Sequence, residues 1–139
     1  MKFRLRQWLS LYQYCAGLCD AGTGLLLVGF PSFTFHLLGF NVVPQPIVFA
    51  RFPGVFVLAV GLTYLWTVTR WPLNEHTAVV WITQWKITAL IRMLVAALIV
   101  WHLMAQAIES RWMTVGITDG ILATVQIIGL EQGWIERAV

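Results

Sequence analysis

The chain has 139 residues, of which 59% are hydrophobic and only 11% are charged, and its formal net charge is +3. Soluble domains carry about 25% charged residues, so this composition excludes an ordinary soluble protein and predicts an integral membrane protein. Basic residues flanking the predicted spans account for the net charge, and nothing indicates nucleic-acid binding. We expect a single transmembrane domain over residues 1–139.

The first predicted span covers about residues 9–30. It follows a basic start and ends before Pro31, and about twenty residues suffice to cross a hydrocarbon core of roughly 30 Å. A basic start followed by an apolar run also resembles a signal peptide. Ala16 and Gly17 do not form a convincing cleavage site, however, so we expect this segment to be retained.

The connection that follows is unusually apolar, with the sequence PSFTFHLLGFNVVPQP over residues 31–46. It is too apolar for a free loop, and too short and broken to span the bilayer. We therefore expect a short helix or turn that lies in the membrane interface.

Three further spans are predicted over about residues 46–67, 82–105 and 112–130. Tryptophans support these boundaries, because indole rings settle at the level of the lipid headgroups. Trp66 and Trp71 close the second span, and Trp81 and Trp85 open the third. The fold class is therefore all-α, an integral membrane four-helix bundle.

Basic residues predict the orientation of the bundle. One side carries Lys2, Arg4, Arg6, Arg70, Lys86 and Arg137. The opposite side carries only Arg51 and Arg111. Both termini should then face the cytoplasm, with the protein in the bacterial inner membrane.

Four ionisable residues lie within the predicted spans: Asp20, Arg51, Arg92 and Asp119. A charge at membrane depth costs about 3 kcal/mol or more, so it normally has a partner or a function. Helical spacing places each charge on a face with small or polar neighbours. These neighbours include Gln13, Ala16, Gly17, Thr23 and Gly24 in the first span, Gly54, Leu58 and Gly61 in the second, Ala96 and Ile99 in the third, and Gly116, Ala123 and Gln126 in the fourth. All four charges are expected to face the interior of the bundle.

Estimated depths pair Asp20 with Arg92 and Asp119 with Arg51, although the partners could be exchanged because the span boundaries are uncertain by a few residues. Two interpretations stay open. The pairs could be buried salt bridges that fix the helix register, or they could line a polar pocket for a lipid headgroup, a quinone, a proton or a small anion.

Other candidate site residues carry a weaker signal. His36 and His102 fall near the outer surface and are candidate haem ligands, and Tyr64 is a candidate donor to a quinone carbonyl. Cys15 and Cys19 lie one turn apart and are expected to be buried apolar residues. No phosphate-binding glycine loop, paired zinc ligands or serine nucleophile elbow is found, so no catalytic residue or metal site is assigned.

Several segments resemble the small bacterial four-helix membrane proteins loosely described as DoxX-like. They are DAGTGLLLVGFP in the first span, ARFPGVFVLAVGLTYLW in the second, the third span with Lys86 and Arg92, and TDGILATVQIIGL in the fourth. The resemblance implies a four-helix fold and, for some members, association with quinone-linked redox systems.

Three functions are compatible with this chain. The first is a non-catalytic subunit or accessory protein of a larger membrane assembly, such as an energy-transducing or electron-transfer complex. It would contact lipid and other subunits, or further copies of itself, through surfaces such as residues 25–28 and 94–100. The second is a quinone- or haem-binding redox protein, and the third is a small oligomeric proton-coupled transporter that uses Asp20. The first predicts a protein without enzymatic activity.

Overall fold

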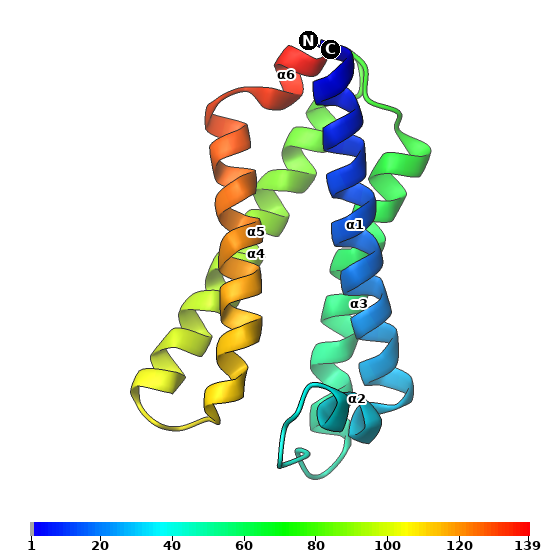
Figure 1. Cartoon of the computed structure of the whole chain (residues 1–139). Coiled ribbons are helices and arrows are strands. Elements are labelled where there is room, and N and C mark those ends of the chain that lie inside the picture. The colour runs from blue at the N-terminus through cyan, green and yellow to red at the C-terminus, as the bar shows by residue number, and fades with distance from the viewer. Residues whose placement is uncertain (1) are drawn as a thin grey trace. The chain divides into compact units, whose positions relative to one another are not determined.

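The protein is helical throughout the part of the chain that the structure describes. A computed structural model describes residues 2–139, with side chains from residue 3 onward, and contains no strand in that range. The long helices are α1 (Lys2–Gly29), α3 (Val48–Arg70), α4 (Ala78–Met104) and α5 (Met113–Glu131). The short ones are α2 (Pro31–Leu37), the 3-10 turn η1 (Ser110–Trp112) and α6 (Trp134–Ala138) (Figure 1). The predicted all-α class is confirmed.

Three of the described helices are long and apolar enough to cross a membrane. They are α3, α4, and the continuous segment of η1 and α5 over Ser110–Glu131. Helix α1 is the longest, with 28 residues, but it is not among the three. Helix α1 contains Gln13, Asp20 and several glycines, so it is less apolar than α3, α4 and α5. A membrane crossing by α1 therefore stays a prediction.

The helix boundaries lie close to the predicted ones, with one clear exception. Helix α1 begins at Lys2 rather than near residue 9, because residues 2–8 contain neither glycine nor proline and continue the helix toward the N-terminus. The short helix expected between residues 31 and 46 is present as α2, with Pro31 at its first position. Gly39 adopts a φ of 79° just after α2, where glycine allows the chain to turn away.

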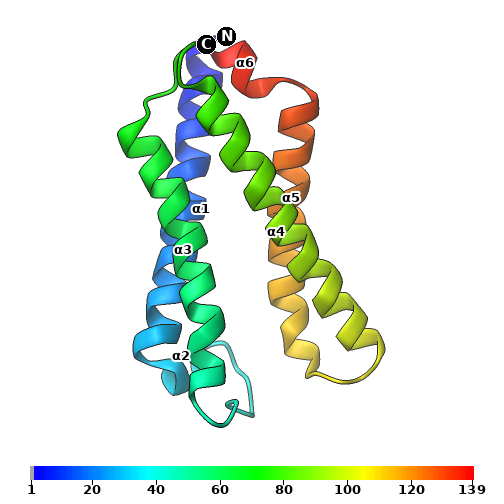
Figure 2. The same cartoon turned by 180° about the vertical axis from the view of Figure 1, so that it is seen from behind.

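The described residues form two compact units. The N-terminal unit comprises Arg6–Pro72, and the C-terminal unit comprises Leu73–Val139 together with residues 2–5. In the N-terminal unit, α1 and α3 run side by side in opposite directions (Figures 1 and 2).

Glycines allow α1 and α3 to approach each other closely. A β-carbon on Gly61 would lie 2.8 Å from the Cα of Ala21, and one on Gly24 would lie 2.6 Å from the Cα of Leu58. Any larger side chain would push the two backbones apart. Gln13, Ala16, Gly17 and Gly24 are buried, as the predicted packing face of the first span required.

The C-terminal unit is an antiparallel pair of helices, α4 and α5, with α6 packed against both. Gly129 of α5 leaves room for Trp85 of α4, because a β-carbon there would lie 2.6 Å from the indole ring. Trp81 and Trp85 are both fully buried. Both indoles pack in the core near the start of α4, and their level at the headgroups stays a prediction.

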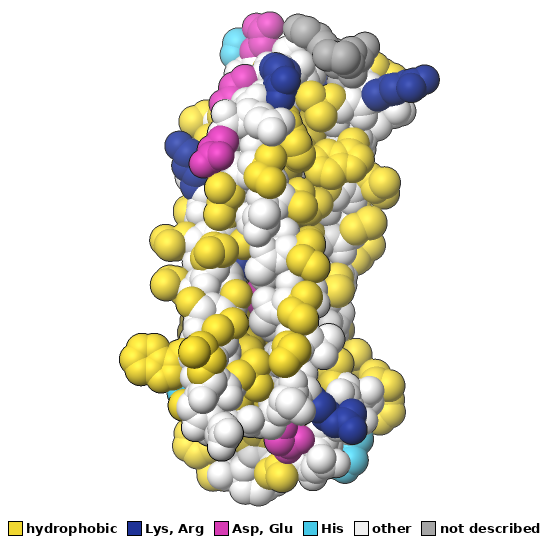
Figure 3. All heavy atoms as spheres, turned by 60° about the vertical axis from the view of Figure 1, so that its left-hand side comes forward, with side chains coloured by type: hydrophobic (Ala, Val, Ile, Leu, Met, Phe, Trp, Pro, Cys, Tyr) yellow, Lys and Arg dark blue, Asp and Glu magenta, His cyan; other side chains and the backbone are white. Residues whose placement is uncertain are grey.

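Apolar side chains cover much of the visible surface. In the view of Figure 3, hydrophobic side chains extend along the helices, whereas Lys, Arg, Asp and Glu gather toward their ends. Exposed large hydrophobic residues occur on each of the long helices α1, α3, α4 and α5. Such a surface is expected of a membrane protein, in which lipid surrounds the middle of each helix.

Candidate functional site: a polar cluster between α4 and α5

Helix α4 carries three buried polar side chains on one face. Gln84, Thr88 and Arg92 follow one another at intervals of four residues, so they stack along one side of the helix. The residues after Arg92 are apolar through Trp101, which keeps this part of α4 helical and membrane-compatible. Between Lys86 and His102, the polar side chains of α4 are Thr88 and Arg92, and both lie on the side that faces α5.

Helix α5 presents a matching face. Gly116, Ala123 and Gln126 are buried, and Asp119 is mostly buried. The small residues at positions 116 and 123 allow close approach to α4, with Ile99 filling the space at Gly116. The predicted stripe of the fourth span is confirmed.

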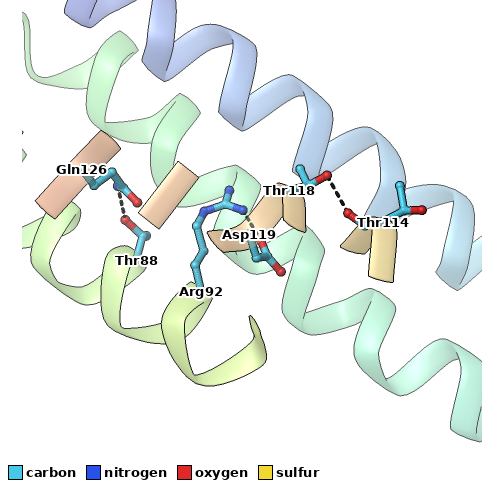
Figure 4. A network of polar contacts seen from close by, with 6 residues as sticks. All are labelled: Thr88, Arg92, Thr114, Thr118, Asp119 and Gln126. Atoms are coloured by element: carbon cyan, nitrogen blue, oxygen red, sulfur yellow. Dashed lines mark hydrogen bonds and ion pairs between the residues drawn. The ribbon is translucent and has the colours of Figure 1, made fainter. Parts of the chain in front are cut away.

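Two cross-helix contacts join these faces (Figure 4). The guanidinium of Arg92 donates from Nη1 to Oδ1 of Asp119, and the two groups form an ion pair. The side chain of Arg92 is 4% exposed and that of Asp119 is 18% exposed. A buried ion pair of this kind neutralises two charges that would each be costly alone.

A second contact lies one turn along α4. Nε2 of Gln126 donates to Oγ1 of Thr88 over 2.8 Å, and Oγ1 of Thr88 donates to the backbone oxygen of Gln84 over 2.8 Å. The hydroxyl of Thr88 is thus both donor and acceptor. The two contacts together fix the position of α4 along α5.

The cluster has one buried acceptor without a hydrogen-bond partner among the described residues, Oε1 of Gln126. Leaving such a group unsatisfied costs about 1–3 kcal/mol. The amide nitrogen of the same side chain is bonded to Thr88, so rotating the amide would only exchange an orphan acceptor for an orphan donor.

Two threonines of α5 outside the cluster, Thr118 and Thr124, face outward, and their hydroxyls hydrogen-bond within their own helix. Thr118 donates to the backbone oxygen of Thr114 over 2.8 Å, and Thr124 donates to that of Gly120 over 2.7 Å. Figure 4 shows Thr118 and Thr114 apart from the Arg92 and Asp119 contact. Because each of these two hydroxyls bonds within its own helix, it presents no unmet donor to lipid.

The predicted charge pairing changes in part. Asp119 takes Arg92 as its partner rather than Arg51, which is one of the exchanged pairings that the depth estimate allowed. Asp20 is half-buried on α1 in the N-terminal unit, and its pairing with Arg92 stays a prediction. Arg51 is exposed, so the expectation that it faces the bundle interior was wrong. The packed face of α3 runs through Ala50, Gly54 and Gly61, and Arg51 lies beside this face.

The two candidate haem ligands are each bonded to their own helix. Nδ1 of His36 lies 2.6 Å from the backbone oxygen of Ser32, and Nδ1 of His102 lies 2.9 Å from that of Leu98. A carbonyl oxygen only accepts, so Nδ1 carries the proton and Nε2 is the nitrogen that could bind a metal. His36 belongs to the N-terminal unit and His102 to the C-terminal unit, and a shared haem stays a prediction.

The candidate quinone residue Tyr64 is fully buried. Its ring packs edge-on against Tyr12, with ring centroids 6.3 Å apart. The geometry gives Tyr64 a packing role between α1 and α3, and its proposed contact with a quinone stays a prediction.

Cys15 and Cys19 are free thiols, and both are exposed on α1. The expectation that they are buried was wrong, because the packed face of α1 runs through Ala16 and Gly17 instead. Among the described residues, no group of three or more His, Cys, Asp and Glu side chains could hold a metal ion.

The sequence analysis missed two members of the cluster, Gln84 and Thr88. Their signal was present in the spacing, because both lie on the face of Arg92 at four-residue intervals. Threonine is common in membrane helices for other reasons, so the spacing becomes informative only once Gln126 is known to lie opposite.

Comparisons with known proteins give no relative from which a function could be transferred. No family model matches the chain, and neither a curated protein nor a solved structure matches it. The resemblance to DoxX-like proteins stays a prediction.

Proposed function

We propose that this protein is a non-catalytic subunit or accessory protein of a larger assembly in the bacterial inner membrane. It would cross the membrane as a four-helix bundle with both termini in the cytoplasm. The polar cluster supports a structural role, because the charges of Arg92 and Asp119 bind each other. Such a pair holds helices in register without requiring a substrate.

The observation that carries this proposal is an exposed, regularly spaced face of α1. Leucines recur every seven residues, and small residues recur every seven residues between them. The leucines are Leu11, Leu18 and Leu25, and the small residues are Cys15, Gly22 and Gly29. All six are exposed. We call these six residues the α1 seam.

The spacing of the α1 seam favours a helix as its neighbour. Steps of four and three residues give a 3.5-residue period, which keeps one stripe facing a partner helix along its whole length. Lipid chains adapt to any apolar surface, whereas close helix packing in membranes selects small residues. The opposite face of α1 follows the same logic, since Gly17 and Gly24 there admit α3.

The seam also has room for a partner. A β-carbon at Gly22 or Gly29 would meet nothing within 4 Å. The exposed residues Leu25 and Leu26 belong to the segment that we predicted as a contact surface, and Leu94 and Leu98 of α4 are exposed likewise. We therefore assign the seam to a transmembrane helix of another subunit or of a second copy.

The test is purification of the native protein in mild detergent, with mass spectrometry of the chains that co-migrate. Gly22→Leu fills the seam, and Gly120→Leu on α5 is the matched control, because a β-carbon at either glycine has open space around it. We expect Gly22→Leu to lose the partner chains and Gly120→Leu to keep them. Retention by both variants would contradict the proposal.

The same purified fraction separates the alternatives. A visible absorption spectrum with haem bands, or an extractable quinone, would favour the redox function. A lone, colourless oligomer would favour transport, and Asp20→Asn would then test whether that carboxylate is required.

A further inference from the structure

Helix α3 has an exposed apolar stripe that ends at a basic residue on each side. The stripe consists of Val48, Phe52, Val55, Phe56, Leu62 and Trp66, each more than half exposed. Arg51 is exposed near one end of α3 and Arg70 is exposed at the other. Arg51 lies three residues after Val48 and four before Val55, so it points to the same side as the stripe.

The distance between these two arginines matches a bilayer. At a rise of 1.5 Å per residue, the 19 residues from Arg51 to Arg70 extend about 28 Å. The hydrocarbon core is roughly 30 Å thick. Trp66 and Trp71 are exposed close to Arg70, as expected for side chains at the headgroup level. Arg51 then lies at the opposite headgroup layer.

The N-terminal unit provides no acidic counter-charge at that end. Residues 21–74 contain no Asp or Glu, and Arg51 forms no ion pair within the described chain. The neighbouring surface is apolar instead, with Phe49 and Phe52 exposed on either side. A permanently charged guanidinium next to exposed phenyl rings matches the chemistry of an anion that carries an apolar body.

Helix α2 adds a second apolar surface at the same end of the unit. It lies beside the start of α3 in both views (Figures 1 and 2). Phe33 and Leu37 of α2 are exposed, and so are Leu38 and Val42 just after it. A short helix with exposed apolar residues suits the boundary between headgroups and acyl chains.

We propose that Arg51 binds the phosphate of an anionic phospholipid, with the acyl chains along the α3 stripe and α2 in the interface of the same leaflet. The fork of a guanidinium matches two phosphate oxygens. The rings of Phe52 and Phe56 are exposed, and their centroids lie 5.0 Å apart. Together they provide an apolar surface beneath the headgroup. This inference rests on the part of the proposed function in which α3 crosses the bilayer, and it does not require a partner subunit.

The test compares lipid retention by the full-length protein and its variants. Protein in mild detergent is mixed with equal amounts of phosphatidylglycerol and phosphatidylcholine, and bound lipids are counted by native mass spectrometry. Arg51→Gln removes the charge, and Arg111→Gln is the matched control, because Arg111 is also exposed and lies on the same predicted side. Arg51→Lys keeps the charge but loses the fork.

We expect the wild type and Arg111→Gln to retain phosphatidylglycerol in excess over phosphatidylcholine. Arg51→Gln should reduce that excess about fivefold, which is the effect of one basic residue at an anionic membrane surface. Arg51→Lys should fall between the two. Circular dichroism checks that each variant has the wild-type helix content.

Three results would overturn the inference. The first is an unchanged excess of phosphatidylglycerol in Arg51→Gln, and the second is an equal loss in Arg111→Gln. The third is displacement of the lipid by millimolar inorganic phosphate, which would indicate a site for free anions. Loss of partner chains from Arg51→Gln, with lipid retention intact, would assign Arg51 to a protein carboxylate while leaving the subunit proposal standing.

Discussion

The amide nitrogen of Gln126 in α5 lies 2.8 Å from the hydroxyl oxygen of Thr88 in α4. Thr88 is one turn from Arg92, whose guanidinium binds Asp119 of the same α5. Two contacts at neighbouring turns restrict both the sliding and the rotation of one helix against the other. The register of α4 and α5 can therefore be tested one side chain at a time.

Breaking the ion pair from one side should be strongly destabilising. Asp119→Asn removes a carboxylate that is bound to the guanidinium of Arg92, a side chain that is only 4% exposed. We expect the free energy of unfolding to fall by about 3 kcal/mol or more. Unfolding in mixed micelles with increasing denaturing detergent measures this loss.

A double variant distinguishes structure from function at the same pair. If the pair is structural, replacing both partners by apolar residues, Arg92→Met with Asp119→Leu, should recover most of the lost stability. Recovered stability with an intact assembly would agree with the subunit proposal. Recovered stability with a lost ligand or lost transport would instead indicate a binding site.

The Thr88 hydroxyl should contribute a smaller and separable amount. Thr88→Val preserves the shape but leaves the buried Nε2 of Gln126 without its acceptor, so we expect a loss of about 1–3 kcal/mol. Thr118→Val is the matched control, because its hydroxyl is exposed and bonds only within α5. An equal effect of both substitutions would argue against the cross-helix bond.

Glycines on the two faces of the N-terminal unit should respond in opposite ways. A β-carbon at Gly61 would lie 2.8 Å from the Cα of Ala21, so Gly61→Ala should cost about 1–3 kcal/mol by forcing α1 and α3 apart. Gly22→Ala meets open space and should be neutral or stabilising by up to about 1 kcal/mol. Thermal unfolding followed by circular dichroism reports both. A neutral Gly61→Ala would show that the close approach is not required.

The cysteines of α1 report whether the α1 seam is covered. Cys15 and Cys19 are exposed, so both should react with an apolar maleimide in mild detergent without denaturation. In the native assembly we expect slower labelling of Cys15, which belongs to the seam. Mass spectrometry after labelling, with single Cys→Ser variants, separates the two thiols. Labelling that requires denaturation would show that both are buried in the folded chain.

The helices could be predicted because their signal is local. Apolar runs of about twenty residues give the spans, and Pro31 marks the first boundary whatever the rest of the chain does. The buried faces of α1 and α5 could be predicted for the same reason, since small residues at helical spacing identify a packing face.

The details that could not be predicted depend on partners elsewhere in the chain. Trp85 at the start of an apolar run could face lipid or the protein core, and only its fit at Gly129 decides for the core. The depth of Arg51 could be estimated from its place in the second span, but depth does not show whether a side chain faces inward or outward. Only the packing of α3 shows that Arg51 points outward. The depth estimate paired Asp119 with Arg51 and allowed the partners to be exchanged, and only the packing of α4 on α5 shows that Asp119 binds Arg92.

The spacing of the ion pair along the chain also constrains how the protein is made. Asp119 follows Arg92 by 27 residues, so at 5–20 residues per second the ribosome adds the carboxylate roughly 1–5 s after the arginine. During that interval the guanidinium of α4 lacks the Asp119 carboxylate that binds it in the folded protein. Insertion of α4 and α5 together, as a preformed hairpin, avoids this unfavourable intermediate.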